Sequence, residues 1–193
     1  TGPLLVGGYF SDPGPSLMRV TGTQREAIAG GLTAPCTGVV ETDVGEVVAA
    51  TTAGLRHRTA AGWVGYGWPP GVVTGPLCSW PGDGVVVAGA FVTSWTDWLG
   101  NEHYTYSPGR VVTPASSGNL GTWYSSFGSM TGRAVTRMAS GNVLLSYTFW
   151  GPSSILSQYD TQGEVGVPVV GPPAVATALA APSEQERITA PAG

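Results

Sequence analysis

The chain has 193 residues, only 10% of them charged, and a formal net charge of −4. Its 30 glycines and 16 prolines exclude a long helical bundle, because these residues are the poorest helix formers. A hydrophobic content of 42% excludes disorder throughout the chain. The acidic balance argues against nucleic-acid binding, which needs clustered basic residues. No apolar run is long enough to predict a membrane span.

Short apolar runs alternate with Gly and Pro, which predicts strands separated by turns. Gln24 to Ala29 is expected to form one short helical turn, and Asp43-Val44-Gly45, Pro81 to Gly84 and Ser140 to Asn142 are expected to be turns. The expected strands are Leu4 to Phe10, Leu17 to Thr21, Val39 to Thr51 (as a hairpin), Trp63 to Tyr66, Gly84 to Thr93, Tyr104 to Tyr106, Arg110 to Thr113, Leu120 to Tyr124, Ala134 to Met138, Val143 to Phe149 and Val165 to Val170.

This spacing predicts an all-β fold, namely a single antiparallel β-barrel or sandwich domain with long Gly/Pro-rich loops and roughly ten to thirteen strands. The crossover helices of a parallel α/β sheet are missing. We see no repeat of fixed period, so we do not expect a propeller or a solenoid. The predicted domain covers residues 1–170. Residues 171–193 are rich in Ala and Pro and are expected to form an extended C-terminal strap or linker.

The two cysteines, Cys36 and Cys78, do not have metal-ligand spacing, and two histidines cannot complete a zinc site. We therefore expect neither a metal nor a cofactor. The cysteines either form a disulfide, which would close a loop of about 42 residues, or remain as two buried thiols. The sequence leaves both alternatives open.

Several charged groups were weighed as catalytic or ligand-binding candidates. Glu41, Asp43 and Glu46 lie close together, as the carboxylates of a glycosidase or a calcium site do. Acidic residues beside a turn are also common on solvated hairpins, and we favour this interpretation. The basic run Arg56-His57-Arg58 suits either a solvated turn, which we favour, or the binding of a carboxylate or phosphate.

A hydrolytic triad requires a nucleophile, a histidine base and an orienting carboxylate. His57 and His103 are the only histidines, and neither lies near a Gly-x-Ser-x-Gly nucleophile elbow. We therefore predict that the protein is not an enzyme.

Aromatic residues gather in two predicted loops, Trp63 to Gly71 and Trp95 to Tyr106. Loop-borne Trp and Tyr provide rigid contact area with a polar tip, as binding surfaces require. Filling the core is the other explanation, but we expect at least one of Trp95 and Trp98 to be exposed. The predicted binding residues are Trp63, Tyr66, Trp68, Trp95, Asp97, Trp98, Asn101, His103, Tyr104 and Tyr106.

The features that carry a resemblance to a known family are the size, the pattern of short strands separated by Gly/Pro turns, the absence of Lys and of glycosylation sequons, a start without Met, the Pro/Ala-rich end and aromatic loops such as Ser94-Trp95-Thr96-Asp97-Trp98. In these features the sequence resembles the protruding (spike) domain of non-enveloped virus capsids. The most similar family is the avian astrovirus capsid spike, and the resemblance spans Thr1 to about Val170. It implies a compact β-barrel-like spike on the virion surface, outside the cell. Such a spike forms a homodimer and attaches to a host-cell receptor, which is a glycan or a protein. No individual residue role is transferred.

Two other functions remain as alternatives. The first is a secreted carbohydrate-binding β-sandwich module, and the second is a hydrolase on a β scaffold. A mean hydropathy of +0.13 with few charges favours a two-fold homodimer, because a monomer would expose much apolar surface. We expect Val, Leu and aromatic residues of the second half of the chain to form that interface.

Overall fold

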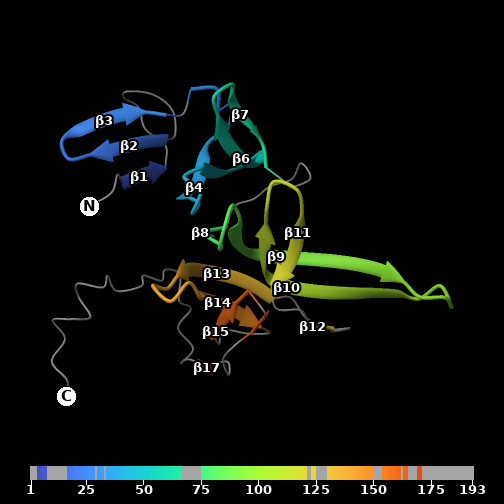
Figure 1. The fold of residues 1–193 in the computed structure, drawn as a ribbon. Coiled ribbons are helices and arrows are strands. Elements are labelled where there is room, and N and C mark those ends of the chain that lie inside the picture. Colours follow the sequence, from blue (N-terminus) through green and yellow to red (C-terminus); the bar gives the residue numbers. More distant parts are fainter. Residues whose placement is uncertain are drawn as a thin grey trace, which may run out of the picture.

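The computed structural model describes residues 4–7, 17–28, 30–32, 34–66, 75–120, 123–124, 130–149, 154–161, 163–164 and 169–170. In these ranges every helix or strand element is a β-strand, so the all-β prediction is confirmed (Figure 1). They hold 17 strands, more than predicted, because several are only two to four residues long. None of their elements is a helix of the length and hydropathy needed to cross a membrane. The predicted strap, 171–193, lies outside the described residues.

The strands form four antiparallel sheets, each from strands that follow one another in the sequence. The first sheet contains β1 (Leu4–Gly7), β2 (Leu17–Thr21) and β3 (Gln24–Ala27). The second contains β4 (Cys36–Glu41), β5 (Val47–Thr51), β6 (Gly54–Thr59) and β7 (Gly62–Gly65). The third contains β8 (Leu77–Ser79), β9 (Val85–Thr96), β10 (Glu102–Val112), β11 (Ser117–Leu120) and β12 (Trp123–Tyr124). The fourth contains β13 (Met130–Arg137), β14 (Val143–Phe149), β15 (Ser154–Asp160), β16 (Gly163–Glu164) and β17 (Val169–Val170).

The four sheets pack face to face, and a separate hydrophobic cluster fills each of the three spaces between them. Alternate residues of β5 contribute to two of these clusters. Val47 and Ala49 join residues of the first sheet, whereas Val48 and Ala50 join β9. Strands buried on both faces read as continuous apolar runs, as VVAA in β5 and VVVA in β9 do. Of the two predicted architectures, barrel and sandwich, the structure has a sandwich, with four layers. None of the described sheets closes into a barrel.

The first strands of the sheets form a row, because β1 contacts β4, β4 contacts β8 and β8 contacts β13. Each sheet is also a meander, because its strands pair mainly in sequence order. Propeller blades use the same strand connectivity. We saw no fixed period in the sequence and expected no repeated unit. The first strands begin at Leu4, Cys36, Leu77 and Met130. Units of such unequal length leave no constant period to detect.

Two sequence-based assignments are wrong in the second and first sheets. In the range Gln24 to Ala29, where a helical turn was expected, Gln24–Ala27 form strand β3, which pairs with β2 around Gly22, and Ala29 lies outside the described residues. The expected turn at Arg56 to Arg58 is the middle of strand β6. In both segments the polar residues give no strand pattern in the sequence. The strand forms because it pairs with a neighbouring strand, and this pairing outweighs local propensity.

Two further assignments differ in the third and fourth sheets. Tyr104 to Tyr106 and Arg110 to Thr113 were predicted as separate strands, but they belong to one strand, β10, with a bulge between Ser107 and Gly109. Pro108 at this bulge explains the apparent break. Strand β15 was missed, because Ser and Gln dilute its apolar pattern.

Three hairpin loops share one geometry. In each, the residue opening the loop pairs with the residue four positions later, and a glycine just before the end has positive φ. The loops are Thr42 to Glu46, Asp97 to Asn101 and Met138 to Asn142, with Gly45, Gly100 and Gly141 at φ 81, 87 and 89. These are three-residue loops with glycine in the left-handed region. The turns predicted around Asp43 and Ser140 are confirmed.

Cys36 and Cys78 are free thiols in the second and third sheets, both buried. Burial raises the pKa of the Cys36 thiol, and it raises that of Cys78 to about 12. Of the two alternatives that the sequence left open, the structure has the buried thiols.

Candidate functional site

The candidate site is the outer half of the β9–β10 hairpin. Figure 1 shows these strands running together out of the stack of sheets and ending in a turn far from it. Their pairing continues from Val85↔Val112 near the stack to Thr96↔Glu102 at the end. In the described residues, β8 and β11 flank only the inner part, and β12 reaches no further than Thr105.

A buried bulge anchors the hairpin where it leaves the stack. The Ser107 hydroxyl is fully buried and lies 2.5 Å from the carbonyl oxygen of Gly109 and 2.8 Å from that of Leu120. Gly132 of β13 packs directly against the backbone of Pro108 and Gly89, with no space for a Cβ. Because two backbones meet here without side chains between them, the bulge fixes the direction in which the hairpin projects.

Asp97 organises the loop at the end of the hairpin. Its carboxylate accepts hydrogen bonds from the backbone N–H groups of Leu99 and Asn101, both at 2.9 Å, and from the Asn101 side-chain amide at 3.0 Å. Oδ2 also lies 2.9 Å from Nε2 of His103. These hydrogen bonds hold the pKa of Asp97 well below its usual range, and the bond with His103 makes the largest contribution. The carboxylate therefore stays ionised and braces the loop.

A stacked pair of rings supports the loop from one face of the hairpin. Trp95 and His103 are directly opposite each other in the pairing, and their rings stack with centroids 4.3 Å apart and an interplanar angle of 17°. Next to them, Tyr104 donates a hydrogen bond of 2.7 Å to Glu102, whose carboxylate raises the pKa of the Tyr104 hydroxyl. The loop is thus held by side chains of the hairpin itself.

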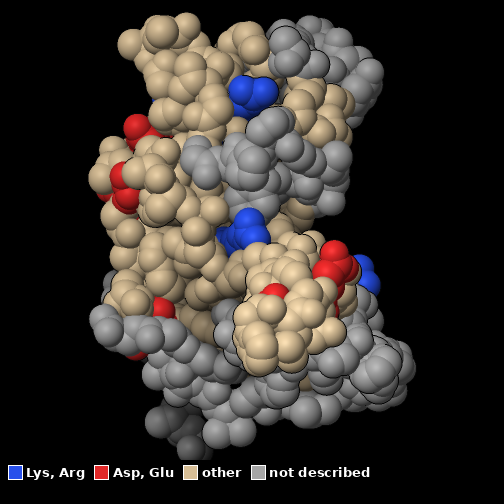
Figure 2. Space-filling model, turned by 90° about the vertical axis from the view of Figure 1, so that its right-hand side faces the viewer, with Lys and Arg blue, Asp and Glu red and all other residues tan. Residues whose placement is uncertain are grey.

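Large apolar side chains remain uncovered at the end. Trp98 is 91% exposed and Leu99 is 64% exposed, at the two central positions of the loop. Trp95 is 48% exposed, so the prediction that Trp95 or Trp98 is exposed is confirmed for both. Val92 and Tyr104 are also exposed, on the face of the hairpin opposite Trp95. In Figure 2, which looks at the hairpin end-on, the projecting lobe is mostly tan, with few charged atoms. We call Trp98 and Leu99 the hairpin tip.

The other predicted residues lie elsewhere. Tyr66 is fully buried, packs in the core between the second and third sheets, and hydrogen-bonds the Asp83 carbonyl. Trp63 is half-buried against the core between the first and second sheets. Trp68 lies outside the described residues. Tyr106, which pairs with Val92 where the outer half of the hairpin begins, is half-buried against the hydrophobic cluster between the third and fourth sheets. The expectation that the rings of the first loop project outward is therefore wrong for Tyr66, because the second sheet buries it.

Leu99 and Val92 were not among the predicted binding residues, because that prediction rested on aromatic and polar residues in loops. A usable signal for Leu99 was present: two large apolar residues, Trp98 and Leu99, stand inside a sequence that otherwise reads as a polar Asp-x-x-Gly-Asn turn. Apolar residues at turn positions cannot reach the core, so they must be exposed or contact a partner.

The candidate catalytic groups do not assemble. Asp43 pairs with Arg137 of β13, and Glu46 lies 3.5 Å from His57. Among the described residues, neither histidine hydrogen-bonds a Ser, Thr or Cys, and no three His, Cys, Asp or Glu side chains converge as metal ligands do. Within that part of the chain, the hairpin tip is the arrangement best suited to contact a partner.

Comparisons with known proteins add little to this picture. No protein-family model matches the chain, and no curated protein is significantly similar. One solved structure, of a protein of unknown function from Bacteroides caccae, aligns with a TM-score of 0.38 and 14% identity. The alignment covers 86% of this chain and 57% of that one, so the chain spans less than two thirds of its length.

Proposed function

We propose that this protein is a non-enzymatic attachment domain that binds its partner through the hairpin tip. The observation that supports this most directly is the exposure of Trp98 and Leu99 at the end of a projecting, internally braced hairpin. Exposed apolar residues on a rigid support give a partner contact area at small entropic cost. In keeping with the resemblance to capsid spikes, we propose a virion-surface location and a host-cell receptor as the partner.

A protein receptor fits the tip better than a glycan does. Sugar binding needs free polar groups beside an aromatic ring. Here the carboxylate of Asp97 accepts four hydrogen bonds within the hairpin, and the amide nitrogen of Asn101 donates one of them. The large side chains most exposed at this end of the hairpin are Trp98 and Leu99, and both are apolar. The carbohydrate-binding module therefore remains the second candidate, supported by the exposed indole alone.

The test compares Trp98→Ala and Leu99→Ala with Val44→Ala. Val44 is 61% exposed in the Thr42–Glu46 loop, which has the same geometry, so it is a matched control. We expect Trp98→Ala to weaken attachment of labelled domain to host cells by about tenfold or more, with an almost unchanged thermal midpoint. Val44→Ala should leave both unchanged.

Attachment that is unaffected by Trp98→Ala in a folded variant contradicts the proposal. Saturable binding to a glycan array, abolished by the same variant, would favour the carbohydrate-binding module. Tyr104→Ala is expected to have a smaller effect than Trp98→Ala, because Tyr104 lies on the flank of the hairpin and is less exposed.

We also propose that the domain forms a homodimer through apolar residues of its second half, as the low charge suggests. Exposed Val92 and Tyr104 on one flank of the hairpin support this. Light scattering at micromolar concentration should give twice the monomer mass. A strictly monomeric mass contradicts the dimer but leaves attachment through the tip untouched.

A further inference from the structure

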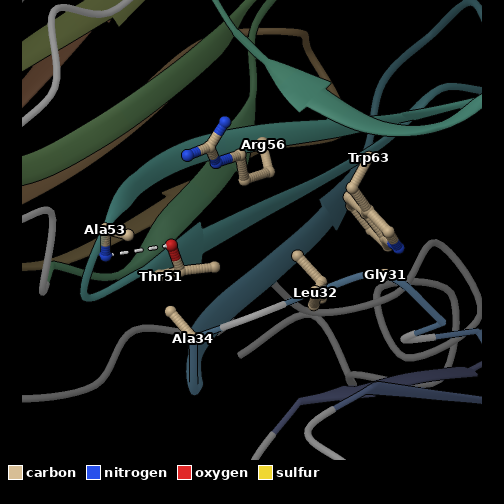
Figure 3. A pocket seen from close by; sticks show the side chains of 7 residues that line it. All are labelled: Gly31, Leu32, Ala34, Thr51, Ala53, Arg56 and Trp63. Atoms are coloured by element: carbon tan, nitrogen blue, oxygen red, sulfur yellow. Dashed lines mark hydrogen bonds between the residues drawn. The ribbon is translucent and has the colours of Figure 1, made fainter.

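A cavity of about 210 Å³ opens on the second sheet, between strands β5 to β7 and the segment that precedes β4. In Figure 3, Arg56 lies above Thr51 and Ala53, Trp63 closes one end, and Leu32 and Ala34 form the opposite wall. The cavity shares no residue with the hairpin. Neither the attachment function nor the packing of the four sheets requires it.

Arg56 is the charged group of this cavity. Its cross-strand neighbours on the same face are Ala49 and Gly65, whose small size leaves space around the guanidinium. A Cβ on Gly65 would lie 3.8 Å from Nη1 of Arg56. Among the described residues, no carboxylate lies within ion-pair distance of Arg56, whereas Arg19 and Arg137 each have an acidic partner. The guanidinium is thus available to pair with an anion.

The end wall of the cavity is held rigid. The indole Nε1–H of Trp63 donates a hydrogen bond of 3.1 Å to the carbonyl oxygen of Ile28. Gly31, with φ of 90, brings the preceding segment close to the same ring, since a Cβ on it would lie 3.9 Å from Cδ1. The ring therefore keeps its place as an apolar wall, with Leu32 beside it. Thr51 adds a hydroxyl, which donates to the Gly54 carbonyl and accepts from the Ala53 N–H.

From this arrangement we propose that the cavity binds a small organic carboxylate with an apolar body. The carboxylate pairs with the Arg56 guanidinium, and the apolar body lies against Trp63 and Leu32. The volume equals that of roughly seven liquid waters, which suits a benzoate-sized molecule. The Trp63 indole and Leu32 beside a single arginine favour such an amphipathic anion over inorganic phosphate, which gains nothing from contact with an indole.

The test is a titration of the isotope-labelled full chain with sodium benzoate, followed by NMR at the Trp63 indole N–H and the Arg56 Nε–H. We expect saturable shifts of both signals with benzoate. Benzyl alcohol has the same ring without the charge, and inorganic phosphate has charge without the ring. Each is expected to bind at least about tenfold more weakly than benzoate.

Arg56→Gln should weaken benzoate binding about tenfold or more, whereas Arg58→Gln should not. Arg58 is the matched control, because it lies two residues further on the same face of β6 but does not line the cavity. Ala34→Leu, which fills the cavity and keeps Arg56, should also abolish binding and serves if Arg56→Gln does not fold. Three results would each overturn the proposal: no saturable shift with benzoate, equal binding of phosphate, or equal loss in Arg58→Gln.

Discussion

The inner and outer halves of the β9–β10 hairpin are both rich in β-branched or aromatic residues, but their surroundings are opposite. In β9, Val85 to Ala88 are fully buried between two neighbouring sheets, whereas Val92 to Thr96 are exposed. Both halves are regular antiparallel strands with continuous register apart from the bulge. The difference shows that β-branched and aromatic residues suffice to continue a strand, while burial depends on what packs against it.

The outer half replaces a core with contacts of its own. The Trp95–His103 stack and the Asp97 hydrogen bonds hold the end. Nearer the stack, the Arg110 guanidinium lies 5.5 Å from the Phe91 ring and donates to the hydroxyl of Thr93 at 3.2 Å. Such contacts are weak singly, so the outer half is expected to contribute little to global stability while keeping a defined shape.

The largest effect is expected where β13 meets the base of the hairpin. Gly132→Ala would place a Cβ against the Pro108 carbonyl and 2.7 Å from the Gly89 nitrogen. Because backbone cannot move aside cheaply, we expect a loss of about 3 kcal/mol in the free energy of unfolding. Gly118→Ala, with nothing within 4 Å of its Cβ, is the control for denaturant unfolding. Equal stability of both variants would show that the bulge does not anchor the hairpin.

A smaller effect separates the two halves of β9 directly. Val86→Ala removes methyl groups from a fully buried site and should cost about 2 kcal/mol. Val92→Ala, on the same strand but 52% exposed, should cost less than about 0.5 kcal/mol. Chemical denaturation measures both. Similar losses would mean that the outer half is buried in solution, for example in a dimer.

The pH dependence of the loop tests its bracing by Asp97. A carboxylate with a lowered pKa stabilises the loop above the ordinary value of 3.8, and that contribution is lost as the pH falls through the lowered pKa. The NMR signal of the Asp97 carboxyl carbon should therefore titrate only below about pH 4, and the signals of the Leu99 and Asn101 amides should change with it. Asp97→Asn should lack this transition. A titration of the Asp97 carboxyl carbon centred above about pH 4 in the unmodified protein would contradict the bracing role.

The smallest effect is expected from a link between layers at the surface. Asp43, in the loop of the second sheet, pairs with Arg137 of the fourth and accepts a bond from Gly82 N–H of the third. Arg137 holds the pKa of Asp43 below its usual range, but the carboxylate is 42% exposed and screened. Asp43→Asn should cost less than about 1 kcal/mol and nothing in about 1 M salt. Glu41→Gln is the control, since Glu41 has no ion pair among the described residues. A larger, salt-independent loss would show that the link has a buried role.

The amino-acid pattern by itself determined the strands whose residues alternate cleanly or form continuous apolar runs. Val143–Phe149 matches its prediction completely, and the hairpin loops at Gly45 and Gly141 were foreseen from glycines that supply positive φ. These features depend on neighbouring residues alone. Exposure of at least one of Trp95 and Trp98 was also expected, because both lie in a predicted loop.

Only the tertiary structure decided where each strand is buried. Arg56 lies in a strand and Tyr66 in the core, because the second sheet pairs and packs there, although the local sequence reads as turn and loop. The bulge at Pro108 joined two predicted strands into the one that carries the hairpin. Cys36 and Cys78 remain separate thiols, because Cys36 packs in the cluster between the first and second sheets and Cys78 in the cluster between the third and fourth. Such outcomes depend on contacts between residues distant in sequence, which no local pattern encodes.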